Sequence, residues 1–212
     1  TVLWKSSLKN FAYVEIAPND GTPFELCDRR RFYNVYAGRR ISGTFHSVKI
    51  TGLEPGKEYR YRIYAKVVEN DDSAYGTDYG PEKRASSSQD AVIRTLDHNT
   101  PECRFFMVND IHGSARKYTS LVGGVDRSRF DFLLMNGDMV SEINDADTML
   151  RKVFDVVPQV TSGIPVMYAR GNHETRGRDA HHFGRFCPNP SGQTYFMFRQ
   201  GPVAFLVLDG GE

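Results

Sequence analysis

The chain has 212 residues, which suffices for one large domain or two smaller ones. Apolar residues make up 40% and charged residues 25% of the chain, a balance that excludes bulk disorder. The net charge of +1, from 27 basic and 26 acidic side chains, gives no indication of a nucleic-acid or anionic-membrane partner. No apolar run approaches the roughly 20 residues of a bilayer-spanning helix, so we expect no transmembrane segment.

The first hundred residues predict an all-β domain. Residues 11–16, 45–50 and 59–65 are rich in aromatic and β-branched side chains, and turn clusters such as Pro-Asn-Asp-Gly at 18–21 separate such runs. The third run alternates apolar residues with arginines, which is typical of a half-buried antiparallel strand. No helical period occurs here, so strands are the only regular structure that we expect.

The pattern changes at residues 96–101, after which strands and helices alternate. Buried strands are predicted at residues 103–108, 130–135 and 164–169, and residues 114–124 are long enough for a short helix. An order of strand, helix, strand, helix and strand implies parallel neighbours with right-handed crossovers. The second half of the chain therefore predicts a layered α/β domain.

The second of these helices is indicated by the spacing of its apolar residues, which are Met149, Val153, Val156 and Val160. Asn144 or Asp145 is the expected cap at its amino end. After the third strand, residues 194–198 and 203–208 predict a hairpin that turns at residues 200–202. The hairpin is the last element that the sequence predicts.

Polar side chains follow each of the three predicted parallel strands. The first strand ends in Asn-Asp-Ile-His-Gly (109–113), the second in Asn-Gly-Asp-Met-Val (136–140) and the third in Gly-Asn-His-Glu (171–174). Ligands of open α/β sheets bind beyond the carboxyl ends of the strands, where these clusters meet. A glycine in each cluster permits a sharp turn and a close approach of the backbone. We therefore expect the three clusters to form one site.

The side chains in these clusters are those of a divalent-metal site. Asp110 and His112 face one ion if the backbone between them is extended, since alternate side chains of a strand point the same way. Asp138 bridges two ions, and Asn172 reaches the second ion through its amide oxygen. Each motif alone is usually structural, but three in this order predict a two-metal centre that acts on a phosphoryl group.

At these residues a family resemblance becomes visible. DIHG, GDMV and GNHE resemble the first three sequence blocks of the calcineurin-like metallophosphoesterase superfamily, over about residues 102–212. The resemblance implies a four-layer α/β sandwich and the same four metal ligands in the same roles. It also implies that His173 is a general acid beside the leaving-group oxygen and not a ligand, and that Glu174 supports the turn behind them.

The N-terminal half resembles the sandwich domain that precedes the catalytic domain in purple acid phosphatases and their bacterial relatives. Leu-Glu-Pro-Gly-Lys-Glu-Tyr (53–59) is similar to a fibronectin type III loop in which a tyrosine bonds back to the preceding corner. We therefore expect a fibronectin-III-like sandwich at residues 1–96, a linker at 97–101 and a metallophosphoesterase domain at 102–212. TVLWKSS at the start resembles the second sandwich strand, so we expect the first strand to be missing.

Two features depart from the resembled families. Purple acid phosphatases have a glycine where this chain has His112 and a tyrosine ligand where it has Ser141, so the site resembles the general Asp-x-His type. The later histidine and Gly-His-x-His blocks of the family do not follow the last predicted strand, and His181 and His182 come too early to replace them. We therefore expect a C-terminally incomplete domain that binds its two metal ions (Fe, Mn, Zn, Mg or Ni) incompletely.

The favoured function is hydrolysis of a small-molecule phosphate ester, with a phosphomonoester first and a phosphodiester or nucleotide second. The alternative is a truncated or degenerate, non-catalytic phosphoesterase-like module that acts as a binding or surface module through its sandwich. The balanced charge disfavours a nuclease. Arg170, Arg176 and Arg178 are interpreted as phosphate or surface contacts. Proteins with this sandwich are mostly exported, so the resemblance implies a periplasmic, cell-surface or secreted location. The sequence leaves the oligomeric state open.

Overall fold

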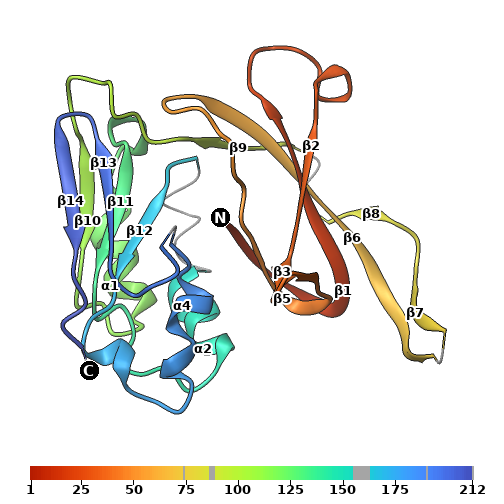
Figure 1. Cartoon of the computed structure of the whole chain (residues 1–212). Helices are drawn as coiled ribbons and strands as arrows, with labels where there is room; N and C mark the ends of the chain where they lie inside the picture. Colours follow the sequence, from red (N-terminus) through yellow and green to blue (C-terminus); the bar gives the residue numbers. More distant parts are fainter. Residues whose placement is uncertain (74, 86–88, 155–162, 190, 212) are drawn as a thin grey trace. The chain divides into compact units, whose positions relative to one another are not determined.

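The computed structural model describes residues 1–73, 75–85, 89–154, 163–189 and 191–211 (Figure 1). The chain divides into two compact units, Thr1–Ile93 and Arg94–Glu212. Each unit contains its own β-sheet, and the parallel strands belong to the second unit. Within the described ranges, no helix is long and apolar enough to cross a membrane.

The first unit is built around two long antiparallel strands, β1 (Val2–Pro18) and β6 (Glu58–Ser73). The order of its sheet is β2-β1-β6-β7, with β5 paired to β1 and with β8 and β9 paired to β6. The other elements are η1 (Phe24–Leu26), β2 (Arg30–Tyr33), β3 (Val35–Tyr36), β4 (Arg39–Arg40), β5 (Gly43–Val48), β7 (Gly76–Tyr79), β8 (Lys83–Arg84) and β9 (Ala91–Arg94). The strands predicted at 11–16 and 59–65 are confirmed as parts of β1 and β6, and the strand predicted at 45–50 overlaps β5, which ends at Val48.

The second half of β1 is buried on both faces, since residues 12–17 are all at most 3% exposed. Ala12, Val14 and Ile16 point to one face of the strand and are at most 1% exposed. The corner that precedes β6 is closed by a tyrosine, because the hydroxyl oxygen of Tyr59 accepts a hydrogen bond from the backbone N–H of Glu54 at 2.9 Å. This bond was expected from the sequence and is confirmed. The fibronectin-III-like and purple-acid-phosphatase-like identity of the unit stays a prediction.

The second unit contains a three-stranded parallel sheet in the order β10-β11-β12, which confirms the predicted parallel neighbours. An antiparallel hairpin of β13 and β14 follows it, as predicted. The elements of the unit are β10 (Phe105–Val108), α1 (Ala115–Val122), η2 (Arg127–Arg129), β11 (Phe132–Asn136), α2 (Ala146–Met149), η3 (Leu150–Phe154), β12 (Val166–Ala169), η4 (His173–Thr175), η5 (Ala180–His182), α4 (Phe183–Phe186), β13 (Phe196–Gln200) and β14 (Val203–Val207).

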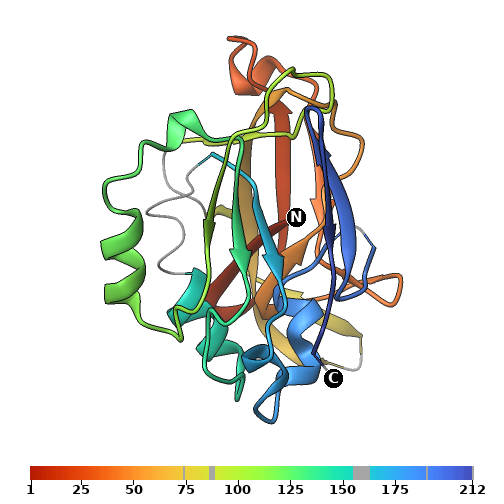
Figure 2. The same ribbon diagram turned by 90° about the vertical axis from the view of Figure 1, so that its left-hand side faces the viewer.

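Aromatic side chains join the hairpin to one face of the parallel sheet. The ring of Phe132 meets the rings of Phe198 and Phe205 edge-on, with centroids 5.1 and 5.2 Å apart. Phe105 of β10 meets Phe205 in the same way at 5.2 Å. Figure 2 shows α1 on the side of the sheet away from the hairpin, so the sheet lies between a helical layer and a β layer.

The helix predicted between the second and third strands is only partly described. It begins as α2 and continues into the π-helical turn η3, and Val156 and Val160 of the predicted apolar spacing lie outside the described residues. Asp145, one of the two predicted caps, accepts a backbone hydrogen bond from the first turn at 2.6 Å. The shorter helix predicted between the first two strands is confirmed as α1.

Residues 97–101, predicted as a linker, pack against the turn of the hairpin. The carbonyl oxygen of Asp97 accepts a hydrogen bond from the N–H of Gly201 at 2.8 Å, and the N–H of Asp97 donates to Oε1 of Gln200 at 2.8 Å. A Cβ atom on Gly201 would lie 2.5 Å from the carbonyl oxygen of Glu102, so only glycine fits there. The segment is thus tied to the second unit.

Candidate metal centre

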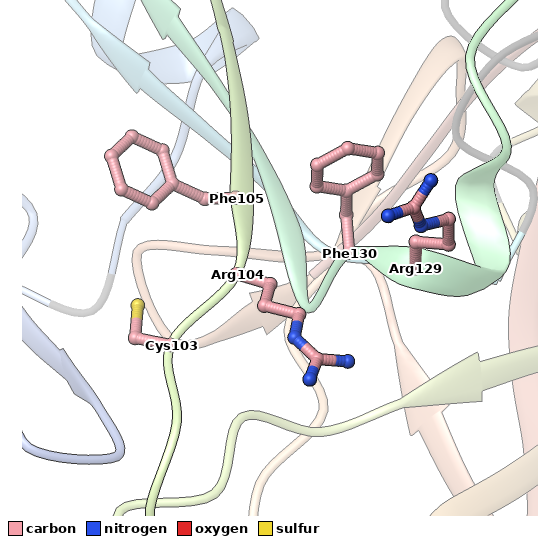
Figure 3. Close-up of a pocket in the computed structure, with 5 residues that line it drawn as sticks. All are labelled: Cys103, Arg104, Phe105, Arg129 and Phe130. Carbon is pink, nitrogen blue, oxygen red and sulfur yellow. The ribbon is translucent and has the colours of Figure 1, made fainter.

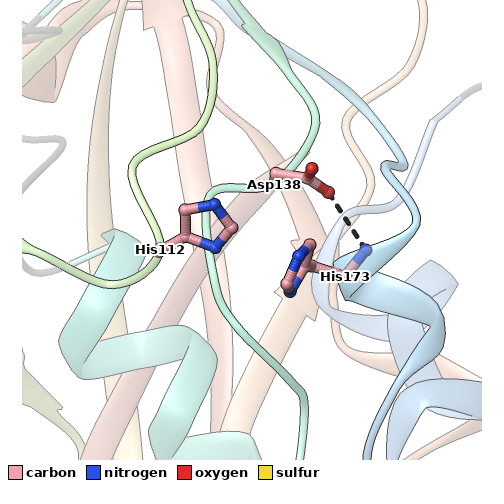
Figure 4. A group of neighbouring side chains, drawn as sticks. All are labelled: His112, Asp138 and His173. Carbon is pink, nitrogen blue, oxygen red and sulfur yellow. Dashed lines mark hydrogen bonds between the residues drawn. The ribbon is translucent and has the colours of Figure 1, made fainter.

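The loops that follow β10, β11 and β12 meet at the carboxyl ends of the strands. His112, Asp138 and His173 each have a ligand-type atom within 4.8 Å of the other two (Figure 4). Nε2 of His112 lies 3.6 Å from Oδ1 of Asp110, and the side-chain amide of Asn172 lies 3.1 Å from Oδ2 of Asp138. The structure thus brings together the five side chains that the sequence predicts to contact metal or substrate.

Three of the four predicted metal ligands have a left-handed backbone. The φ angles are 57° at Asp110, 53° at His112 and 55° at Asp138, and Ala37 is the only other described non-glycine residue with a positive φ. The expectation of an extended Asp110–His112 segment is therefore wrong, and turns bring the two side chains together. Such conformations cost about 1–3 kcal/mol each and concentrate at functional sites.

Two glycines allow the loops after β11 and β12 to touch. A Cβ atom on Gly137 would lie 2.9 Å from the Cα atom of Gly171, and a Cβ atom on Gly171 would lie 2.3 Å from Oδ1 of Asp138. A backbone hydrogen bond joins the loop after β10 to the loop after β11, because the N–H of His112 donates to the carbonyl oxygen of Asp138 at 3.0 Å. The close backbone approach expected from these glycines is confirmed.

The carboxylate of Glu174 is fully buried behind the cluster and connects two of its loops. Its donors are the backbone N–H groups of Asp138 (2.9 Å), Met139 (2.8 Å), Val140 (3.3 Å) and Gly171 (3.0 Å) and the hydroxyl of Tyr168 (2.7 Å). Burial, with the nearby Cys187 and Glu174, raises the pKa of Tyr168, so its hydroxyl keeps the proton that it donates. These hydrogen bonds hold the two loops together, as expected of a residue that supports the turn.

The imidazole of His173 has a defined orientation. Its Nδ1 atom lies 2.9 Å from the carbonyl oxygen of Ser141, and a carbonyl oxygen only accepts, so Nδ1 carries a hydrogen. Nε2 is then the atom left to exchange a proton. The ring stands edge-on to that of His112 at 4.4 Å, and the backbone N–H of His173 donates to Oδ1 of Asp138 at 3.0 Å.

The three arginines of the third loop have different partners. Arg170 is largely buried and forms a two-pronged ion pair with Asp209, with distances of 3.1 and 2.7 Å, so its interpretation as a phosphate or surface contact is wrong. Arg178 donates from Nε to the carbonyl oxygen of Asn144 at 2.8 Å. Arg176 alone lies against the cluster, with Nη1 3.4 Å from Nε2 of His173.

A pocket of about 300 Å³ lies near the amino ends of β10 and β11, where Figure 3 shows its lining residues: Cys103, Arg104, Phe105, Arg129 and Phe130. These residues precede or begin the strands, whereas the polar cluster follows them. Arg104 is already paired with Glu102, and Figure 3 shows its guanidinium group directed away from that of Arg129. The pocket is therefore separate from the candidate metal centre.

The side chains of the cluster fit a metal centre. Imidazole, carboxylate and amide oxygen together suit Mn, Fe, Zn or Mg. Oδ1 of Asp138 accepts a hydrogen bond from the backbone N–H of His173, and Asp110 is 63% exposed, so both carboxylates retain free lone pairs. His181 and His182 lie on η5 with their rings 3.9 Å apart and do not belong to the cluster.

The parallel sheet, its hairpin layer and the polar cluster at its carboxyl edge together form a domain with a candidate metal-binding site. The sequence model of the calcineurin-like phosphoesterases matches residues 103–211, and the chain belongs to this family. The predicted superfamily is confirmed, whereas the resemblance of the first unit to purple acid phosphatases stays a prediction. A search of curated proteins gave no match.

Proposed function

We propose that the protein is a phosphomonoesterase that uses two metal ions. The family of residues 103–211 supports a metal-dependent phosphoesterase in general. The observation that carries the proposal is the convergence of three loops. His112 and His173 have ligand-type atoms within 4.8 Å of Asp138, and the amide of Asn172 lies 3.1 Å from it. Asp110 lies 3.6 Å from His112. The preference for monoesters rests on the resemblance of the first unit to the sandwich of purple acid phosphatases.

In this proposal the four ligands divide between two ions. Asp110 and His112 would hold the first ion, Asp138 would contribute to both, and Asn172 would hold the second through its amide oxygen. When bound, the ions supply Lewis acidity toward phosphoryl oxygens and lower the pKa of a water nucleophile. The buried Glu174 keeps the loops in position, because it accepts hydrogen bonds from the backbone on both sides of Asp138 and from Gly171.

His173 is proposed to act on the leaving group. Its Nδ1–H is engaged with the carbonyl oxygen of Ser141, so a proton given to the leaving group would come from Nε2. The attacking water gives up a proton to solvent and its oxygen bonds to phosphorus, while the bond from phosphorus to the leaving oxygen breaks and its electron pair remains on that oxygen. The Nε2 proton neutralises the leaving oxygen, which is general acid catalysis.

The direct test is an assay of the full-length protein after chelation and dialysis. Mn²⁺, Fe²⁺, Zn²⁺, Mg²⁺ or Ni²⁺ is added back, and hydrolysis of nitrophenyl phosphate is compared with that of bis-nitrophenyl phosphate. We expect metal-dependent hydrolysis with the monoester preferred. A preference for the diester would favour the second substrate class, and inactivity with every metal would favour the non-catalytic binding module.

We also propose an extracytoplasmic location, which the resemblance of the first unit to exported phosphatases supports. The proposal is independent of the metal centre and is tested by fractionating the producing cells. Detection of the protein in the periplasm, at the cell surface or in the medium is expected. Detection in the cytoplasm alone would contradict it.

A further inference from the structure

The side chain of Arg176 lies over two residues of the candidate centre. Its Nη2 atom is 2.8 Å from the side-chain amide of Asn172, and its Nη1 atom is 3.3 and 3.4 Å from the two ring nitrogens of His173. The side chain is otherwise exposed. The backbone of Arg176 is held on both sides, because its N–H donates to His173 and its carbonyl oxygen accepts from Ile143.

The side-chain amide of Asn172 can form hydrogen bonds with both of its neighbours, Asp138 and Arg176, in one orientation only. With its nitrogen toward Asp138, the amide donates to Oδ2 at 3.1 Å and Oδ1 at 3.3 Å, and its oxygen accepts from Arg176. A cation held jointly by Asp138 and Asn172 requires the amide oxygen on the Asp138 side. The amide must then turn over, and its NH₂ group faces the guanidinium donor of Arg176. Two donors at hydrogen-bond distance repel, so Arg176 must leave Asn172.

We propose that Arg176 is an anion-binding residue that metal binding releases from Asn172. This inference rests on the proposed function and adds a residue to it. A released guanidinium group has donors in a planar fork and no acceptor, which matches the oxygens of a phosphate. Since Nη1 already lies beside Nε2 of His173, an oxyanion bound there contacts both groups. The same side chain thus opposes metal binding and favours phosphate binding.

The test uses Arg176→Gln in the full-length protein, with Arg129→Gln as the control. Arg129 carries the same charge and lies near the amino ends of the strands. Calorimetry measures the Kd for Mn²⁺, and then the Kd for inorganic phosphate with Mn²⁺ bound. For Arg176→Gln we expect Mn²⁺ to bind roughly threefold to tenfold more tightly and phosphate roughly tenfold more weakly, as for one hydrogen bond and one charge-assisted bond. Arg129→Gln should change neither.

The two opposite shifts distinguish this proposal from simple damage to the loop, which would weaken both ligands. Arg176→Lys keeps the positive charge but lacks the planar set of guanidinium donors, so its phosphate affinity should lie between those of Arg176→Gln and the wild type. Unchanged or weaker Mn²⁺ binding in Arg176→Gln overturns the coupling through Asn172. Unchanged phosphate binding overturns the anion role. A wild-type protein that binds no Mn²⁺ overturns the proposed function together with this inference.

Discussion

At the scale of single residues, Asp138 has contacts with every part of the candidate centre. Its carboxylate lies beside the amide of Asn172, accepts the N–H of His173 and belongs to the cluster with His112. Gly171 leaves the space that this carboxylate occupies. A side chain in this position is the one expected to serve both ions.

We predict that Asp138→Asn removes more bound metal than Asn172→Ala does. The asparagine keeps the shape of the side chain but removes negative charge from both ions, whereas Asn172→Ala removes a neutral ligand from one ion. Elemental analysis of the two purified full-length variants measures the difference. Equal metal content in the variants would contradict the bridging role of Asp138.

His173→Ala should leave the metal content nearly intact and lower turnover. General acid groups contribute roughly 10²–10⁴-fold, and the contribution shrinks when the leaving group needs no proton. We therefore expect a smaller loss for nitrophenyl phosphate than for an alkyl phosphate, measured as kcat at saturating metal. A loss of the same size for both substrates would show that His173 orients the phosphate instead, and a loss of metal would show that it is a ligand.

A residue of the first unit gives a prediction about pH. His46 is fully buried, its ring is stacked on Trp4 at 4.7 Å, and Nε2 lies 3.2 Å from the hydroxyl of Ser6. Burial lowers the pKa of His46 to about 4. The unfolded chain therefore takes up the proton first, near its ordinary pKa of 6.5.

We predict that the first unit loses stability as pH falls from about 6.5 toward 4, by at most roughly 3 kcal/mol, because each pKa unit corresponds to about 1.4 kcal/mol. Urea unfolding at pH 7.5 and pH 5, followed by the fluorescence of the single tryptophan, measures the change. His46→Phe should show a smaller difference between the two pH values. An equal difference in the variant would assign the pH dependence to other groups.

At the scale of elements, the loops after β11 and β12 are joined by the buried carboxylate of Glu174, which accepts four backbone N–H groups and one hydroxyl. Glu174→Gln should destabilise the second unit, because the amide NH₂ must face N–H donors, and each unsatisfied buried group costs about 1–3 kcal/mol. Thermal unfolding measures the loss, with the exposed Glu142→Gln as the control. Equal stability of the two variants would contradict this role.

The elements of the second unit were predictable because each leaves a local pattern in the sequence. Runs of apolar residues gave β10, β11 and β12, and the spacing of Met149 and Val153 indicated a helix. That helix is partly π-helical, which the apolar spacing did not show. The single continuous strand β1 was also not predicted as such, because its first half has an irregular pairing with β5 that depends on the partner strand.

The sequence predicted which residues form the site but not their backbone geometry. Polar residues at three strand ends identified Asp110, Asp138 and Asn172, because strand order alone places those ends together. The left-handed backbone at Asp110 depends on neighbouring loops, so the expectation of an extended segment failed. The contacts of Glu174 were invisible because most of its partners are backbone N–H groups, which leave no trace in the sequence.

At the scale of the whole molecule, all six predicted site residues belong to the second unit, which spans Arg94–Glu212. The three loops that carry them continue the parallel strands of one sheet. The first unit supplies none of these side chains. We therefore assign the proposed chemistry to the second unit, and any contribution of the first unit is inferred only from its resemblance to phosphatase sandwiches.

The central claim, that the three loops form a metal centre around Asp138, is tested most directly by anomalous X-ray scattering. Crystals of the full-length protein, loaded with Mn²⁺, are measured at the manganese absorption edge. The account predicts two anomalous peaks at coordination distance, roughly 2.0–2.6 Å, from the carboxylate of Asp138, one beside His112 and one beside Asn172. Absence of a peak at Asp138, or peaks coordinated only by other residues, would contradict it.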